Sequence, residues 1–188
     1  MPIVRCAWAS KITDPEYLEY HDLEWSVPIT DDVALFELLC LEGAQSGLSW
    51  ITILKKREMY RKHFCRFDFR KIAQMKETAV GDILAKGGVV RHLGKIKSVF
   101  DNAKAVLKLL TEFPSLHAYF QTVLVGVDVR DPGITQTPVS EASVRVSKDL
   151  KKRGFNFVGP TTMQAFLQAS GLFQAHDRGC FKCPKKSR

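Results

Sequence analysis

Two cysteines and two histidines at opposite ends of the chain are residue types that bind zinc. His176 and Cys180 have the spacing H-x3-C, which places both side chains on one helical turn or tight loop. With Cys6 and His21 they would complete a closed tetrahedral site that ties the N-terminal arm to the C-terminal end. Two alternatives remain open. Cys183 forms a competing C-x2-C pair with Cys180, or the histidine is a surface residue near a free thiol.

A carboxylate close to aromatic residues is the second feature with chemical potential. Glu42 directly follows the apolar run of residues 35–41. It would stand at the negative end of a helix, where a carboxylate is disfavoured by about 0.3–1 kcal/mol. A cationic ligand held over aromatic rings would compensate, since a cation–π contact contributes about 0.5–2 kcal/mol. The candidate rings are Trp8, Tyr17, Tyr20, Trp25 and Trp50. In the alternative, Glu42 pairs with an arginine at the edge of the core or caps a loop, and the rings are ordinary core residues.

Residues 154–159 predict a tight turn between two helices. Gly154 suits the position just past a helix end, and Pro160, after Gly159, suits the first turn of the next helix. A helix that begins at such a turn presents unpaired amides, which bind phosphate well, and Lys151 and Lys152 add positive charge beside it. The alternative is an ordinary helical hairpin with its aromatic residues in the core.

The elements that must position these residues are predicted to be helices. The apolar positions 96, 99, 100, 103, 106, 107 and 110 follow helical spacing, and no stretch alternates convincingly with period two. We expect helices at about 31–42, 50–64, 77–86, 95–113, 115–124, 143–153 and 161–170, a short one from Asp68, and a loop at 126–140. The fold class is therefore all-α, as a single domain of residues 1–188 with two helical lobes around a cleft.

Composition limits the partners. The net charge of +8 is compatible with a polyanion as partner. However, residues 178–188, which include the basic tail 181–188, contain five basic residues and no acid, so much of the positive charge lies at this end of the chain. Five cysteines without a signal peptide argue against a disulfide framework. No apolar run reaches the roughly 20 residues needed to cross a bilayer. We expect a cytoplasmic monomer that does not associate with membranes.

Five segments resemble the family of bacterial 3-methyladenine DNA glycosylases of type I. They are RCAW (5–8), DPEYLEYHDLEWSVP (14–28), LFELLCLEGAQSGLSWITILKKRE (35–58), SKDLKKRGFNFVGPTTMQAF (147–166) and SGLFQAHDRGC (170–180). The resemblance covers nearly the whole chain. Ser26 and Ser46 depart from the residues common in the family, and neither is a proposed ligand of zinc or base.

The resemblance implies a helix-hairpin-helix glycosylase fold with one structural zinc ion and an assignment for each site residue. The zinc ligands would be Cys6, His21, His176 and Cys180. The base pocket would consist of Glu42, Tyr20, Trp50, Trp8 and Tyr17, with Glu42 and Tyr20 as the catalytic residues. DNA binding falls on the hairpin from Gly154 to Gly159, on Lys151 and Lys152, and on Leu48 with Gly47, which would probe the duplex near the lesion.

The implied reaction is hydrolysis of the N-glycosidic bond of 3-methyladenine in alkylated double-stranded DNA after base flipping. Free 3-methyladenine would be the product, and strand cleavage is not expected, because no lysine is placed to form a Schiff base. The family typically lacks the catalytic aspartate of related glycosylases, so Asp177 is not expected to act as a base. The alternative is a zinc-stabilised DNA-binding module without catalysis.

Overall fold

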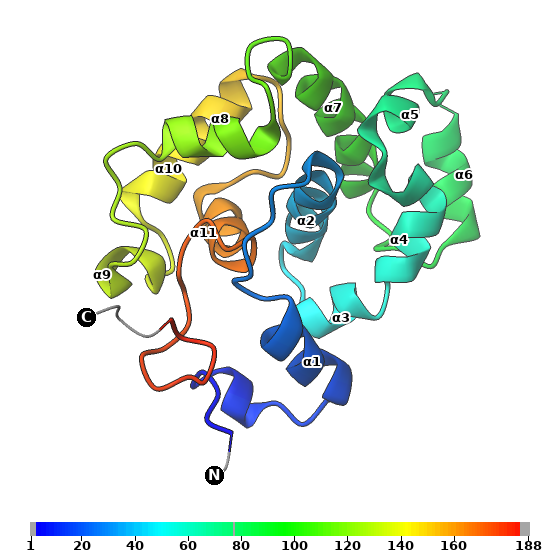
Figure 1. Ribbon diagram of the computed structural model, residues 1–188. Helices are drawn as coiled ribbons and strands as arrows, with labels where there is room; N and C mark the ends of the chain where they lie inside the picture. Colours follow the sequence, from blue (N-terminus) through cyan, green and yellow to red (C-terminus); the bar gives the residue numbers. More distant parts are fainter. Residues whose placement is uncertain (1–2, 77, 185–188) are drawn as a thin grey trace.

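The computed structural model describes residues 3–76 and 78–184, and the regular elements in these ranges are all helices (Figure 1). They are the 3-10 helix η1 (Ala9–Lys11), α1 (Pro15–Leu23), α2 (Asp32–Gln45), α3 (Trp50–Leu54), α4 (Arg57–His63), the 3-10 helix η2 (Cys65–Phe67), α5 (Phe69–Gln74), α6 (Ala79–Lys86), α7 (Leu93–Leu109), α8 (Leu116–Val123), α9 (Pro132–Thr135), α10 (Glu141–Lys152) and α11 (Pro160–Ala169). The all-α prediction is confirmed. Lys185, Lys186 and Arg188 of the predicted basic tail lie outside the described residues.

Helix α2 lies in the middle of the molecule and is buried on nearly every face. Residues 38–44 along it, Glu42 included, are all buried, as expected for a helix packed between other helices rather than on the surface. It contacts α7 and η2 on one side and α8 and α11 on the other. Figure 1 shows the same arrangement, with α4–α7 on one flank of α2 and α8–α11 on the other.

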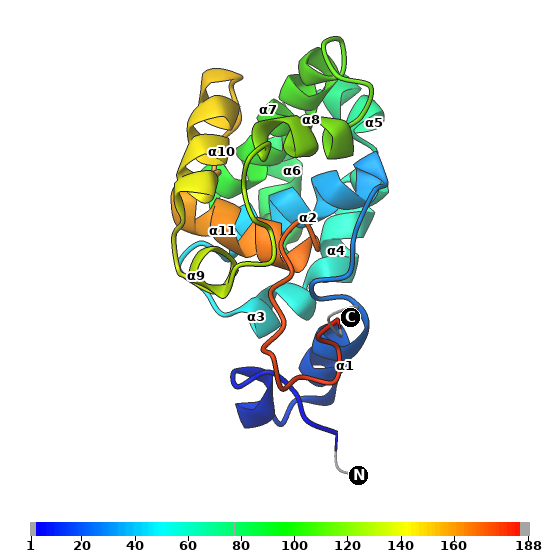
Figure 2. The ribbon, with the colours of Figure 1, turned by 60° about the vertical axis from the view of Figure 1, so that its left-hand side comes forward.

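The N-terminal arm and the C-terminal segment lie side by side at one end of the molecule in both ribbon views (Figures 1 and 2). The Phe181 N–H donates to the Val4 carbonyl at 2.8 Å. Farther in, Gly171 has φ +70°, and a Cβ there would stand only 2.5 Å from the backbone of Val27 and Pro28. Glycine at 171 therefore lets the C-terminal segment pass directly against the chain that follows α1.

Several helix ends differ from those predicted. Helix α2 continues past Gly43 to Gln45, because Gly43 keeps the helical conformation and the left-handed glycine that ends the helix is Gly47, with φ +78°. Glu42 thus lies in the last turn of α2. The predicted helix 50–64 is two helices, α3 and α4, separated at Lys55 and Lys56. Helices α1 and α9 were not predicted. Each is short and starts with a proline after a capping aspartate, Asp14 or Asp131.

The other predicted helices are present with shifted bounds. Helix α10 begins at Glu141 instead of 143, because Ser140 and Ser143 form a capping box. Asp68 caps α5 as expected, by accepting hydrogen bonds from the amides of Arg70 and Lys71. Within the described residues, none of the helices has both the length and the apolar character required to cross a membrane.

Candidate functional site

An aromatic cavity of about 280 Å³ opens where α1, the end of α2, α3, α11 and the C-terminal segment meet. Its lining is Trp8, Tyr17, Tyr20, Trp25, Glu42, Gln45, Trp50, Gln136, Ala165, Gln168, Ala175 and Asp177. All five residues predicted to bind a base belong to this lining. The volume is close to the lower end of typical small-molecule pockets, which suits a ligand the size of one nucleobase.

Glu42 is the buried carboxyl group of this cavity. Its side chain is 4% exposed, and Oε2 has no hydrogen-bond partner among the described residues. No lysine or arginine in the described part of the chain forms an ion pair with it, so the predicted alternative of an arginine partner is not found. Burial raises the pKa of Glu42 from 4.5 to about 8. A buried polar atom without a partner is costly, so its retention points to a ligand.

The aromatic rings form a continuous wall next to Glu42. Ring centroids are 5.4 Å apart for Trp8 and Tyr17, 6.3 Å for Tyr17 and Tyr20, and 5.3 Å for Tyr20 and Trp50. Burial raises the pKa of both Tyr17 and Tyr20, and the nearby charge of Glu42 raises it further. Both phenols are therefore close to the carboxylate and stay protonated. The Trp50 Nε1 is another buried polar atom that lacks a partner within the described chain.

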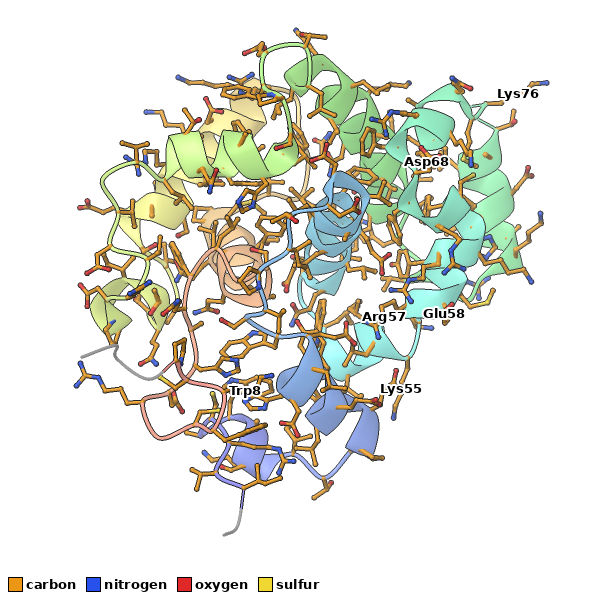
Figure 3. All side chains as sticks on the ribbon, viewed as in Figure 1. Trp8, Lys55, Arg57, Glu58, Asp68 and Lys76 are labelled. Carbon is orange, nitrogen blue, oxygen red and sulfur yellow. The ribbon has the colours of Figure 1, made fainter. Side chains whose placement is uncertain are left out.

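Ion pairs between helices hold the wall in place. Lys55 at the end of α3 pairs with Asp14, the cap of α1, at 2.9 Å, and Arg57 on α4 pairs with Glu24 just after α1. Figure 3 shows Lys55 just after α3 and Arg57 at the start of α4, both on the side of α1, and Trp8 between α1 and the C-terminal segment. These contacts fix α1, which supplies Tyr17 and Tyr20, against α3, which begins with Trp50.

The four predicted metal ligands converge behind Trp8. One ligand atom from each of Cys6, His21, His176 and Cys180 lies within 4.8 Å of the others, and all four residues are buried. The Nδ1 of His176 lies 3.4 Å from Sγ of Cys6 and 3.6 Å from Sγ of Cys180, and Nε2 of His21 lies 3.7 Å from the latter sulfur. A tetrahedral zinc site with ordinary bond lengths separates sulfur and nitrogen ligands by about 3.5 Å, so the donor set fits zinc.

The surroundings of the cluster orient both imidazoles. Nδ1 of His21 faces Asp22 at 2.8 Å, and Nε2 of His176 faces the Trp25 carbonyl at 3.1 Å, so the other nitrogen of each ring points into the cluster. Burial lowers the pKa of His176 to about 4 and raises the pKa of the Cys6 thiol to about 12. A neutral imidazole is ready to ligate, and a thiolate here needs a divalent cation as its counter-charge.

The hairpin between α10 and α11 has the predicted conformation. Gly154 has φ +90° directly after α10, and Pro160 is the first residue of α11, with Gly159 as its N-cap. Lys151 and Lys152 are exposed on the last turn of α10. The first amides of α11 have no side-chain cap, which leaves them available to an external acceptor.

Leu48 lies in the loop between α2 and α3 and is 42% exposed. Gly47 before it has φ +78° and open space around its α-carbon, so the loop turns sharply and presents Leu48 outward. An exposed leucine between Gln45 and Trp50, which both line the cavity, is compatible with the predicted role of probing a duplex, and that role stays a prediction.

Sequence reasoning missed several polar residues around the site. Gln168 and Gln136 line the cavity, Asp22 orients a cluster histidine, and Lys95 and Asn102 are buried on α7. The last two had a readable signal, because positions 95, 98 and 102 repeat with helical spacing directly beside the apolar stripe of α7. Gln136 and Asp22 lie in or next to short elements and offered no such pattern.

Comparison with known proteins identifies similar chains along nearly the full length. Residues 8–183 match the family model described as methyladenine glycosylase. DNA-3-methyladenine glycosylase 1 of Escherichia coli (strain K12) is 46% identical over 183 residues, covering 94% of this chain and 95% of that protein. A crystal structure of 3-methyladenine DNA glycosylase I superposes with a TM-score of 0.88 at 43% identity, covering 96% of this chain and 100% of that one. A variant of such an enzyme in complex with 3-methyladenine gives 0.87 at 35% identity, covering 96% and 98%.

Proposed function

The chain belongs to the methyladenine glycosylase family, and from that membership we propose separate roles in base excision for three parts of the molecule. They are the aromatic cavity, the hairpin from Gly154 to Gly159, and the cluster of Cys6, His21, His176 and Cys180. The protein is a DNA-3-methyladenine glycosylase of base-excision repair. The observation that supports the proposed division of labour most strongly is the unpartnered Glu42 carboxyl group inside an aromatic cavity.

The flipped base occupies the aromatic cavity. N3-methyladenine is a cation while it is attached to deoxyribose, so a carboxylate and π-faces both favour it. Glu42 accepts hydrogen bonds from the adenine edge, which carries an amine donor beside a ring-nitrogen acceptor. Tyr20 and Trp50 hold the ring, with Tyr17 and Trp8 extending the wall. Extrusion of the nucleotide costs a few kcal/mol, less at a damaged pair, and these contacts offset that cost.

The chemistry requires no general acid. The N-glycosidic bond between the base and C1′ breaks, its electron pair goes to the base, and the base leaves neutral. The oxygen of a water molecule forms the new bond to C1′ and releases a proton to solvent. The transition state is expected to resemble an oxocarbenium ion. Binding the base by Glu42 alone would stabilise the ground state, so acceleration comes from contacts that strengthen as charge moves to the sugar.

The hairpin and Leu48 are the parts that meet the duplex. Gly159 has an ordinary φ of −63°, and a Cβ there would touch nothing within 4 Å, so the fold itself does not demand glycine at this position. A close approach by a phosphate to the amides of α11 would demand it. Lys151 and Lys152, in the last turn of α10, add positive charge next to the hairpin. The exposed side chain of Leu48 would fill the gap left by the extruded nucleotide.

Cys6, His21, His176 and Cys180 hold one structural zinc ion. Zinc bound there has all its positions taken by protein, so its chemistry is to neutralise two thiolates and cross-link two chain ends. Elemental analysis should give about one zinc per chain. A double variant, Cys6→Ser with Cys180→Ser, is expected to lose the metal, whereas stoichiometric metal in that variant would refute the ligand set.

Release of the base from DNA tests the function directly. The protein is incubated with methylated duplex DNA, and the released bases are separated by chromatography. Free 3-methyladenine without strand cleavage is the expected outcome, and no release above background would eliminate the glycosylase assignment. A non-catalytic zinc-stabilised DNA-binding module would also release nothing, but such a module has no need for the Glu42 cavity.

A further inference from the structure

Helix α7 has a buried polar stripe that the base-binding cavity does not use. Lys95 is 8% exposed, and its Nζ donates to the carbonyls of Ala44 at 2.9 Å and Ser46 at 2.6 Å. These carbonyls belong to the end of α2 and the start of the loop that presents Leu48. Burial lowers the pKa of Lys95, so its position is costly unless the two hydrogen bonds are needed.

Asn102 lies two turns farther along the same face of α7 and is 2% exposed. Its Oδ1 accepts from the N–H of Asn156 at 2.7 Å, and its Nδ2 donates to the carbonyl of the same residue at 3.1 Å. Asn156 is in the middle of the hairpin from Gly154 to Gly159. One side-chain amide therefore holds both polar groups of one hairpin residue, as a neighbouring β-strand would.

Phe157 packs the hairpin against both α2 and α7. It has φ +57°, a conformation that non-glycine residues adopt only when their surroundings impose it. A Cβ on Gly43 of α2 would stand 3.1 Å from the Phe157 Cβ and 3.3 Å from its carbonyl oxygen. On the other side, the Phe157 ring meets His92, the N-cap of α7, with centroids 6.0 Å apart. The hairpin is thus pressed onto both helices.

From these contacts we propose that α7 is a bracket that fixes the loop with Leu48 and the hairpin at one spacing, and that Lys95 and Asn102 are its positioning residues. The proposal rests on the proposed function, in which both segments contact DNA. Lys95 and Asn102 are seven positions apart, which corresponds to about 10 Å along the helix axis. The hairpin must hold the phosphates of the duplex while one nucleotide is extruded near Leu48. A variable distance between the hairpin and the loop with Leu48 would therefore weaken productive binding.

The test compares variants that remove each anchor with one that leaves both. Lys95→Met and Asn102→Leu remove the hydrogen bonds to the loop and to the hairpin. Ser98→Ala is the matched control, because Ser98 lies on the same stripe but bonds only to the Lys95 carbonyl within its own helix. For each protein the measurements are the melting temperature, kcat and KM on a methylated duplex, and the Kd of free 3-methyladenine from tryptophan fluorescence.

We expect KM for the duplex to rise about tenfold in Lys95→Met and Asn102→Leu, since each loses buried hydrogen bonds to a DNA-contacting segment. The Kd of the free base should stay within about twofold of the wild type, because neither residue lines the cavity. A purely structural role would weaken free-base binding and duplex turnover together. Should Asn102→Leu fail to fold, Asn102→Asp, which keeps the acceptor for the Asn156 N–H, should give an intermediate KM.

Two results would overturn the proposal. One is an unchanged duplex KM in the folded variants. The other is an equal loss of affinity for the free base. If the wild-type protein itself releases no 3-methyladenine from DNA, the proposed function fails and the bracket fails with it. If the wild type is active and the variants keep its duplex KM, the proposed role of α7 fails while the proposed function stands.

Discussion

At the scale of the residue, the burial of Glu42 costs stability, and the proposed role of this carboxyl group in binding the base would explain why the cost is tolerated. Its pKa of about 8 means that the folded protein keeps a proton which the unfolded chain, with a carboxyl pKa near 4.5, releases. Between these two values the unfolded state binds fewer protons, so the free energy of unfolding falls as the pH rises, and it levels off above pH 8. At one pKa unit per 1.36 kcal/mol, the loss reaches roughly 3 kcal/mol at pH 7.

Replacement of Glu42 by glutamine should therefore stabilise the protein. Glu42→Gln removes the titration, so its free energy of unfolding should exceed that of the wild type by a few kcal/mol at pH 8 and match it at pH 4.5. Urea unfolding at both pH values measures this difference. The matched control is Glu19→Gln on the exposed face of α1, which should change stability by about 0.5 kcal/mol or less. Equal stability of Glu42→Gln and wild type at pH 8 would mean that the carboxyl group is not buried at a cost.

At the scale of the element, the two glycines of the hairpin are expected for different reasons, Gly154 for its backbone conformation and Gly159 for access by a phosphate. Gly154 has φ +90°, so Gly154→Ala should lower the free energy of unfolding by about 1–2 kcal/mol. Gly159 has an ordinary φ and open space, so Gly159→Ala should leave stability within about 0.5 kcal/mol.

The same pair should behave differently toward DNA. Gly159→Ala is expected to weaken binding to the duplex about tenfold, because its methyl group occupies the space through which a phosphate approaches the first amides of α11. Thermal unfolding and fluorescence anisotropy with labelled duplex DNA measure both effects. Normal duplex affinity of Gly159→Ala would contradict the placement of DNA on the hairpin.

Local patterns predicted most of the helices and the turn, but not the contacts between elements. Gly154 and Pro160 predicted the hairpin because the conformations they favour are local. The break at Lys55 and Lys56 was not visible, because residues with good helix propensity fill it and the contacts of Lys55 with α1 belong to the tertiary structure. Likewise, the hydrogen bonds of Asn102 to the hairpin span 54 residues, beyond any local pattern.

At the scale of the whole molecule, the buried cluster of Cys6, His21, His176 and Cys180, which is the proposed zinc site, joins the N-terminal arm to the C-terminal segment, and both carry part of the cavity wall. Cys6 is two residues from Trp8, and Cys180 follows Asp177, which also lines the cavity. The spacing H-x3-C alone left Cys183 as a competing ligand. In the structure the four ligand atoms that converge are those of Cys6, His21, His176 and Cys180, without Cys183, and the sequence could not show this because long-range packing brings residues 6 and 21 to residue 180.

Removal of the metal should loosen this end of the molecule. Treatment with a chelator is expected to lower the melting temperature and to weaken binding of free 3-methyladenine, since Trp8 would no longer be held against α1. Cys180→Ser should reproduce both effects, while Cys183→Ser should retain the metal and behave like the wild type. Loss of zinc from Cys183→Ser would instead favour the C-x2-C pair as ligands.

If the Glu42 carboxylate binds the cationic base, as proposed, its ionisation should control the pH dependence of kcat/KM on a methylated duplex. In the proposed role, protonation of Glu42 in the free enzyme would remove the negative charge that favours the cationic base. In the wild type and in Glu19→Gln, kcat/KM should rise by up to about tenfold per pH unit toward pH 8 and then level off, at the pKa of about 8 that burial imposes on Glu42. Glu42→Gln should show a low profile without this rise. A wild-type profile that is flat between pH 6 and 9, or a rise that Glu42→Gln retains, would rule out this role for Glu42.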